Sequence, residues 1–297
     1  MIVRTVVLLL LILAPARITA VQDVTPADDY GIERVIVISL DGARPDAIWA
    51  NTAPHMQGLA ARGAVAWTAS TVYPSVTLPA HASMLTGLSI AEHGLDHNDS
   101  LYPCPRIAAP TFLTITAAAD QPTAMVVGKE RLCQLAPEGI DYTFAREGDR
   151  SVVDRVIELL DADFTVIFAH FPNPDYFGHL TGWMSDIYLR ELRRTDDQVG
   201  RLLAALDDRA LTASTLIILT ADHGGLGTTH GRDIPEDMLI PWMIAGPGVT
   251  PGVDLGALGV EISVADTAHT VLWALGLPTP ESALGRPVVA AFASAAR

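Results

Sequence analysis

The stretch Val35-Ile36-Val37-Ile38-Ser39-Leu40-Asp41-Gly42 decides the class of fold. It begins with an almost unbroken apolar run rich in β-branched side chains, and an acidic residue and a glycine follow at once. A strand with one face in water alternates apolar with polar residues, whereas a strand covered on both faces has a continuous apolar run. The stretch therefore predicts a strand that is buried on both faces and ends just before Asp41.

Further runs of this kind recur along the chain, at residues 124–127, 164–169, 216–220 and 241–245. Helical patterns lie among them, most clearly at 151–160, 185–206 and 263–275. This alternation predicts an α/β fold with a mainly parallel central sheet and helices on both faces. In such sheets, ligands bind outside the carboxyl ends of the strands, so the residues after each strand are where a site is expected.

The first twenty residues have the layout of a signal peptide. Arg4 precedes an apolar run at residues 6–14, and small residues end at Ala20 before a polar stretch. The run is short for a bilayer and is followed by Pro15 and Arg17, so we expect cleavage after Ala20 rather than a retained anchor. The sequence therefore predicts a secreted or periplasmic protein. Residues 21–297 show no repeat, linker or further membrane span, which predicts a single domain.

Charge and cysteine content limit the partners and the compartment. The 34 acidic against 19 basic residues give a net charge of −15, which argues against a stable nucleic-acid partner. A small phosphorylated substrate is compatible, because bound divalent cations would reverse the local sign. Cys104 and Cys133 favour a disulfide in an oxidising compartment, although two separate buried thiols fit almost as well. The oligomeric state is left open.

Aspartate and histidine residues gather where three of the predicted strands end: Asp41, Asp175, His179, Asp222, His223 and His230. Taken singly, such an aspartate is usually a helix cap, and such a histidine is usually a surface or hydrogen-bonded core residue. Packed together without cations, the carboxylates would repel one another and lose hydration, so the set predicts bound metal. Carboxylate and imidazole ligands suit zinc, with manganese or iron as alternatives, and disfavour calcium. The ligands suffice for two ions.

The segment from Tyr73 to Gly87 supplies a candidate nucleophile. Thr77 stands just before a predicted helix that has Pro79 in its first turn. A hydroxyl there lies where free backbone N–H groups and the helix dipole attract negative charge. On this segment alone, a nucleophilic threonine and an ordinary N-cap threonine are equally good interpretations.

Together these segments resemble the alkaline-phosphatase superfamily, and within it the type I phosphodiesterase and nucleotide pyrophosphatase branch. The resemblance covers residues 33–290 and rests on these motifs in order: Asp41 after the first strand, Thr77-x-Pro79-x-His81, His93-Gly94 with Asn98, Asp175-x-x-Gly178-His179, Asp222-His223-Gly224 and His230-Gly231. It implies an alkaline-phosphatase-like fold and a phosphoric ester hydrolase with two divalent metal ions, for which zinc is the best fit.

The resemblance also implies the role of each residue. One metal ion would be held by Asp175, His179 and His230, and the other by Asp41, Asp222, His223 and the Thr77 oxygen. Thr77, activated by its metal ion, would attack phosphorus and form a phosphothreonine intermediate. The Asn98 amide and a backbone N–H near Leu78 would hold non-bridging phosphate oxygens. His81 and His93 would orient loops rather than bind metal.

Lys129 is the only lysine, and it follows the predicted strand at 124–127. It is either a cation that binds a phosphate or carboxylate of the substrate or a solvated loop residue.

The chain departs from the pattern of the family that it resembles in ways that limit the substrate. Ala80 stands where nucleotide pyrophosphatases usually have asparagine, and His230 follows His223 without their long insertion, so a nucleotide pocket is not implied. Sulfatases of the superfamily need Cys or Ser, then Pro and Arg at two-residue spacing, which Thr77-x-Pro79-x-His81 does not provide. A phosphomonoesterase or phosphonate hydrolase with the same metal site is the alternative enzyme. A secreted, non-catalytic metal-binding protein is the alternative from another class, and Thr77 and Asn98 count against it.

Overall fold

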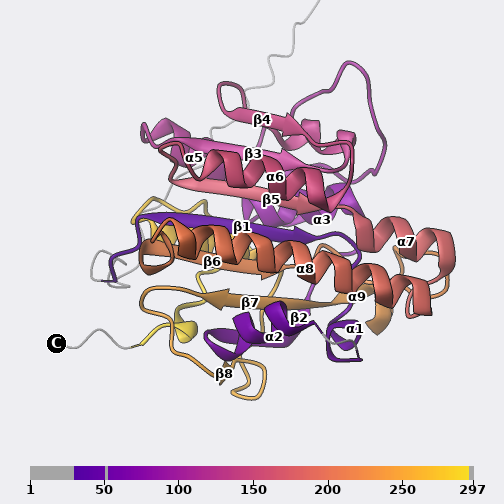
Figure 1. Cartoon of the computed structure of the whole chain (residues 1–297). Coiled ribbons are helices and arrows are strands. Elements are labelled where there is room, and N and C mark those ends of the chain that lie inside the picture. Colours follow the sequence, from indigo (N-terminus) through magenta and orange to yellow (C-terminus); the bar gives the residue numbers. More distant parts are fainter. Residues whose placement is uncertain (1–29, 51–52, 294–297) are drawn as a thin grey trace, which may run out of the picture.

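The computed structural model describes residues 30–50 and 53–293, so the predicted signal peptide lies outside the described residues. An eight-stranded sheet runs through the described chain in the order β4-β3-β5-β1-β6-β7-β2-β8 (Figure 1). The strands are β1 (Arg34–Leu40), β2 (Ala64–Ser70), β3 (Thr123–Val127), β4 (Asp141–Phe144), β5 (Val166–Phe171), β6 (Thr215–Thr220), β7 (Leu239–Ala245) and β8 (Val253–Asp254).

Most of the strand pairs are parallel. Strand β1 pairs in parallel with β5 on one side and with β6 on the other, and β3 pairs in parallel with β4 and β5. Strand β7 is antiparallel to both β6 and β2. The predicted strand at 241–245 is therefore present but runs against its neighbours, and the prediction of a mainly parallel sheet is confirmed.

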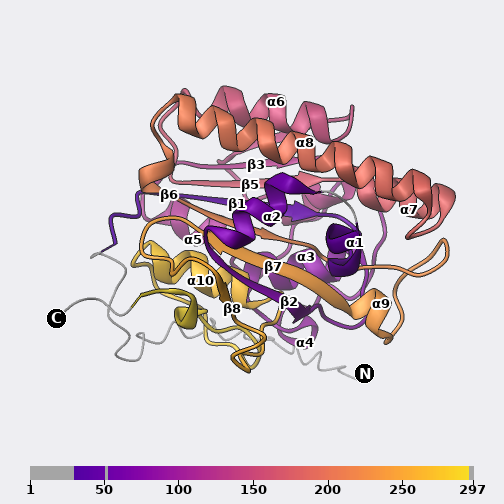
Figure 2. The ribbon, with the colours of Figure 1, turned by 60° about the horizontal axis from the view of Figure 1, so that its bottom comes forward.

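Helices cover both faces of the sheet, as predicted (Figure 2). On one face α2, α6 and α8 pack together, and on the other α3, α5 and α10 do so. The helices are α1 (Pro45–Ala50), α2 (Pro54–Ala61), α3 (Thr77–Thr86), α4 (Ile90–His93), α5 (Phe112–Ala118), α6 (Asp149–Leu159), α7 (Asn173–Thr181), α8 (Asp186–Asp208), α9 (Pro235–Met238) and α10 (Asp266–Ala274), with 3-10 turns η2 (Glu130–Leu135), η3 (Thr212–Ser214) and η4 (Val289–Ala291).

The central strands form the core because both of their faces are covered. Residues 35–40 of β1 are fully buried, and so are nearly all residues of β5 and β6. Burying one aliphatic side chain of this kind contributes roughly 1.5–3 kcal/mol. The apolar run that predicted the fold thus also contributes to its stability. Across the described ranges, no helix is both long and apolar enough to cross a bilayer.

Two boundaries differ from the sequence prediction in ways that matter for the site. Strand β5 ends at Phe171 rather than at residue 169, so His170 is part of the strand. Helix α6 begins at Asp149, two residues early, because Asp149 and Asn173 exchange hydrogen bonds between side chain and backbone. Strands β2, β4 and β8 were not predicted, because they are short or carry polar residues among the apolar ones.

Candidate metal centre

Three neighbouring strands bring the predicted metal ligands to one edge of the sheet. Asp41 follows β1 directly, and Asp222 and His223 follow β6. Asp175 lies in the first turn of α7, just after β5. In register, Ser39 of β1 stands opposite both His170 of β5 and Thr220 of β6, so the three strands end nearly level. The parallel order therefore places residues more than 100 positions apart in one cluster.

Gly42 allows the turn after β1 to approach the ligands closely. Its φ is +71°, and a Cβ there would lie 2.9 Å from the Cα of Asp175. Its N–H donates to Asp222 Oδ1 at 3.1 Å, and its carbonyl accepts from Trp183 Nε1 at 2.8 Å and from the Tyr188 hydroxyl at 3.0 Å. A side chain at this position would push Asp175 away, which is the physical reason for glycine here.

Each of the three ligand histidines is oriented by a backbone carbonyl. Their Nδ1 atoms lie 2.8–2.9 Å from carbonyl oxygens: His179 from Thr228, His223 from Gly224 and His230 from Ser75. A carbonyl only accepts, so Nδ1 carries the proton, and Nε2 of a neutral ring keeps its lone pair. Burial lowers the pKa of His223, and burial together with the neighbouring His223 lowers the pKa of His230 to about 4.

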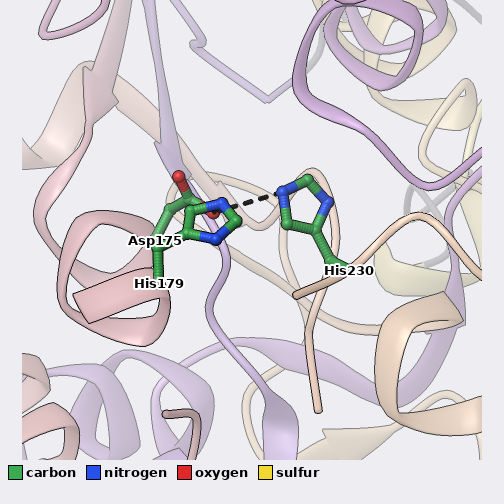
Figure 3. A group of neighbouring side chains, drawn as sticks. All are labelled: Asp175, His179 and His230. Atoms are coloured by element: carbon green, nitrogen blue, oxygen red, sulfur yellow. Dashed lines mark ion pairs between the residues drawn. The ribbon is translucent and has the colours of Figure 1, made fainter. Parts of the chain in front are cut away.

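The first predicted ligand set converges in the structure (Figure 3). Asp175 Oδ1 lies 3.4 Å from His179 Nε2 and 3.6 Å from His230 Nε2. It has no hydrogen-bond partner. Asp175 and His179 are four residues apart on α7, which puts both on one helix face, and His230 approaches from the loop after β6.

Part of the second predicted set also converges, and Asp175 joins it. The ligand atoms that come together are those of Asp41, Asp175 and His223. His223 Nε2 lies 3.5 Å from Asp41 Oδ1 and 4.0 Å from Asp175 Oδ1. Asp222, which was predicted in this set, places Oδ2 3.3 Å from His223 Nε2. Asp175 thus stands between the two sets.

The unsatisfied atoms of this cluster fit bound cations. Asp41 Oδ1, Asp175 Oδ1, Asp222 Oδ2 and His223 Nε2 are buried without a hydrogen-bond partner. Leaving one buried acceptor unpaired costs about 1–3 kcal/mol. All four are acceptors when the carboxyls are ionised and the His223 ring carries its proton on Nδ1, and a divalent cation between them satisfies several at once. The residues present therefore fit metal ions.

Lys129 contacts the same carboxylates. Its Nζ lies 2.7 Å from Asp41 Oδ2, 2.6 Å from Asp175 Oδ2 and 3.3 Å from Thr77 Oγ1. Burial alone would lower the pKa of Lys129, but Asp41, Asp175 and Asp222 outweigh it and raise the pKa. Burial would likewise raise the pKa of Asp41, but Lys129 and His170 hold it well below its usual value. Lys129 is therefore part of the cluster and not a solvated loop residue.

His170 is a site residue that the sequence analysis missed. Its Nδ1 accepts the N–H of Gly128 at 3.2 Å, so its Nε2 carries the proton and donates to Asp41 Oδ2 at 2.8 Å. It thereby orients Asp41 and joins it to the residue before Lys129. The predicted strand ended at residue 169, and this boundary hid a histidine whose side chain points toward β1.

Thr77 is the first residue of α3 and is buried. Its carbonyl accepts from His81 Nδ1 at 2.7 Å, and His81 Nε2 lies 2.8 Å from the Ser39 hydroxyl. His93 Nε2 lies 3.0 Å from the Ser83 hydroxyl. The contacts of His81 fix the start of α3 against β1, and its Nδ1 also lies 3.4 Å from Asp222 Oδ2. That His81 and His93 orient loops rather than bind metal stays a prediction.

Asn98 lies beside the start of α3, but one predicted donor is already engaged. The Leu78 N–H donates to Asn98 Oδ1 at 3.0 Å, so it is not free for phosphate as the sequence analysis expected. The bond fixes the amide and leaves its NH2 group as the donor for a ligand. The structure pairs Cys104 with Cys133, and Arg131 Nη1 donates to the Asn98 carbonyl at 2.8 Å. The favoured disulfide is thus present, and it ties the loop of Asn98 to η2.

Comparison with known proteins finds a matching family. The model of the family "Type I phosphodiesterase / nucleotide pyrophosphatase" matches residues 35–239. Ectonucleotide pyrophosphatase/phosphodiesterase family member 7 of Rattus norvegicus is 23% identical over 240 residues, which are 72% of this chain and 54% of that protein. The 2,3-bisphosphoglycerate-independent phosphoglycerate mutase of Roseobacter denitrificans is 27% identical over 163 residues, 54% of this chain and 31% of that protein. The chain thus spans about half the length of the rat protein and less of the mutase.

Solved structures share the fold. Murine ectonucleotide pyrophosphatase/phosphodiesterase 5, an inactive threonine-to-alanine variant in complex with AMP, superposes with a TM-score of 0.74 at 15% identity, covering 85% of this chain and 97% of that one. A 2-O GAG sulfatase gives a TM-score of 0.73 at 15% identity, covering 87% of this chain and 73% of that one. At these identities the likeness shows an alkaline-phosphatase-like fold, which phosphodiesterases and sulfatases have in common.

Proposed function

Because the chain belongs to the type I phosphodiesterase/nucleotide pyrophosphatase family, we propose that it is a metal-dependent hydrolase that cleaves a small phosphodiester through a covalent phosphothreonine at Thr77. Two divalent ions, most suitably Zn²⁺, would serve it, since imidazole and carboxylate ligands occur together in both sets. The predicted signal peptide supports a secreted or periplasmic location.

The observation that carries the proposal is that Lys129 contacts both the candidate nucleophile and two of the candidate metal ligands. Lys129 Nζ touches Thr77 Oγ1, Asp41 and Asp175 together, so the hydroxyl lies within the cluster that holds the unpaired ligand atoms. A threonine that served only as a helix cap would stand at the N-cap, but the N-cap of α3 is Val76 and Thr77 is the first residue of the helix.

The residues of the chain divide the work of the reaction. Bound divalent ions would supply the positive charge that makes the Thr77 hydroxyl acidic and stabilises the leaving oxygen. Thr77 attacks phosphorus from the start of α3, where the helix dipole favours the negative charge that develops. The NH2 group of Asn98 donates to a non-bridging oxygen, a contact whose loss typically costs on the order of 10²–10³ in rate. The attack expels one alcohol and leaves the other ester group on the phosphothreonine, and water then releases the phosphate monoester from Thr77.

A substrate comparison and two variants test the proposal. The zinc-loaded protein is assayed with bis(p-nitrophenyl) phosphate and with p-nitrophenyl phosphate, and kcat/KM is compared. We expect the diester to be preferred, Thr77→Ala to lose turnover while keeping metal and fold, and Thr77→Ser to keep part of it. Mass spectrometry of enzyme that is acid-quenched during turnover of the diester should find a p-nitrophenyl phosphoryl group on Thr77 only. Full activity of Thr77→Ala would refute the nucleophile.

Other outcomes of the same assay point to the other candidates. A preference for the monoester would make the protein a phosphomonoesterase, and turnover of a phosphonate alone would make it a phosphonate hydrolase, with the same metal centre. A metal-replete protein inactive on all three would support a non-catalytic metal-binding role. Cell fractionation with N-terminal sequencing of the mature protein tests export and cleavage after Ala20.

A further inference from the structure

A cavity of about 600 Å³ opens beside the ligand cluster. Helix α7 contributes the ligands Asp175 and His179 to its lining, together with the apolar side chains of Tyr176, Phe177 and Leu180. Tyr176 and Leu180 are 60% and 61% exposed, although they are large and mainly apolar. A volume of a few hundred Å³ and apolar walls next to polar groups are typical of small-molecule sites. The cavity can therefore take the organic group of an ester bound at the metals.

The cavity is lined by cations, although the chain as a whole is acidic. In a chain with a net charge of −15, two cations, Lys129 and Arg146, line it. Glu147 is its one carboxylate besides the ligand Asp175. Once metal engages Asp175, Arg146 and the ammonium of Lys129, released from Asp175, remain beside one carboxylate, so the cavity favours an anion.

Arg146 is available for a ligand. Within the described residues it has no ion pair, and its recorded contact is with the ring of Phe144, whose centroid lies 5.1 Å from the guanidinium carbon. Other arginines near it are paired: Arg150 with Asp154, and Arg155 with Asp141. Stacking on a ring holds a guanidinium while its N–H groups stay free for a planar or tetrahedral oxyanion.

The segment that carries Arg146 is held rigidly against the metal-binding helix. Asp149 at the start of α6 accepts from the Asn173 N–H at 3.0 Å, and Asn173 Oδ1 accepts from the Asp149 N–H at 3.4 Å. A Cβ on Gly148 would lie 2.5 Å from Asn173 Oδ1, so the two segments are in close contact. Arg146 and the ligands on α7 thus belong to one preorganised unit.

We propose that this cavity selects esters whose organic group has an apolar body and ends in an oxyanion, which Arg146 binds. The inference rests on the proposed function and adds to it a class of substrate. Tyr176, Phe177 and Leu180 contact the apolar body, and the reacting phosphate lies at the Asp175 end. A terminal carboxylate and a terminal phosphate share the chemistry that Arg146 recognises.

The test compares two substrates that differ only at the far end. One is a p-nitrophenyl phosphodiester whose second substituent is a phenylalkyl group ending in a carboxylate, and the other ends in the isosteric carboxamide. For the zinc-loaded wild type we expect kcat/KM to favour the carboxylate about tenfold or more, as a charge-assisted hydrogen bond allows. Arg146→Gln should bring the ratio close to one. Arg150→Gln, which removes a nearby arginine that does not line the cavity, should keep the wild-type ratio.

A wild-type ratio near one, or a ratio unchanged by Arg146→Gln, overturns the proposal while leaving the hydrolase in place. A third substrate that ends in a phosphate is assayed in parallel. The oxyanion whose substrate has the larger kcat/KM relative to the carboxamide is the one that Arg146 prefers. If the wild type hydrolyses neither ester, the proposed function fails. Calorimetry with the free alcohols of the two second substituents, one ending in carboxylate and one in carboxamide, then tests whether the cavity binds an oxyanion. Tighter binding of the carboxylate, lost in Arg146→Gln, supports the cavity, and equal binding refutes it.

Discussion

Replacing Lys129 by methionine should destabilise the metal-free protein and raise its affinity for metal. In the described part of the chain, Lys129 is the one lysine or arginine that contacts the carboxylates of Asp41 and Asp175, at 2.7 and 2.6 Å. Its ammonium lies among the atoms that metal ions would engage. Metal binding must therefore displace it, whereas without metal it is the main source of positive charge there.

The size of the effect follows from burial. Removing one partner of a buried ion pair typically costs about 3–5 kcal/mol. The Lys129 side chain is 19% exposed, which favours the lower end, about 3 kcal/mol. For a chain of this length 1 kcal/mol corresponds to roughly 2–4 °C, so the metal-free variant should melt roughly 6–12 °C below the wild type. An interaction present only in the metal-free state opposes metal binding by the same free energy, so zinc should bind roughly a hundredfold more tightly.

Thermal melts of chelator-treated and zinc-loaded protein, with zinc affinity from competition with a chromophoric chelator, measure both quantities. Arg150→Met is the matched control, because it removes an exposed cation whose ion pair among the described residues is with Asp154 of the same helix, α6. Its melting temperature and zinc affinity should match the wild type. An unchanged zinc affinity of Lys129→Met would refute the displacement of Lys129 by metal, and an unchanged metal-free melting temperature would refute its role as counter-cation.

Three further predictions concern the frame of the site. Gly42→Ala should weaken zinc binding at least tenfold by competition titration, because the new Cβ would lie 2.9 Å from the Cα of Asp175; an affinity equal to wild type contradicts the close approach. Burial raises the pKa of Asp149 to about 7, so the folded state holds a proton there that the unfolded chain has lost above pH 4, and stability should fall as pH rises from 4 to 7. Urea unfolding at pH 5 and pH 8 gives the fall in unfolding free energy, and Asp149→Asn should reduce this fall by on the order of a few kcal/mol. An equal fall in wild type and variant would show that the carboxyl titrates normally. Replacing Cys104 and Cys133 together by serine should cost about 3 kcal/mol of unfolding free energy, since the bridge closes a loop of 29 residues, and it should lower kcat by loosening Asn98; no change in stability contradicts the first part.

The amino-acid pattern was enough for the class of fold and for most of the site. Continuous apolar runs such as residues 35–40 reveal strands covered on both faces, because water exposure on one side would require alternation. Asp41, Asp175 and Asp222 stand where those strands end, so their convergence was predictable once the sheet was taken as parallel. The strands β2, β4 and β8 were not predicted. A strand at or near the edge of a sheet buries fewer side chains, so its sequence is less clearly apolar.

The sequence by itself determined the kinds of ligand, their place after each strand and the presence of a candidate nucleophile. Tertiary structure alone decided which groups touch: that Asp175 stands between both ligand sets, that His170 orients Asp41, that Leu78 N–H is taken by Asn98, and that Lys129 lies among the carboxylates. The reason is physical. A local pattern reports what each residue buries, whereas a contact between residues far apart in the chain depends on strand order and register, which arise only when the whole core packs.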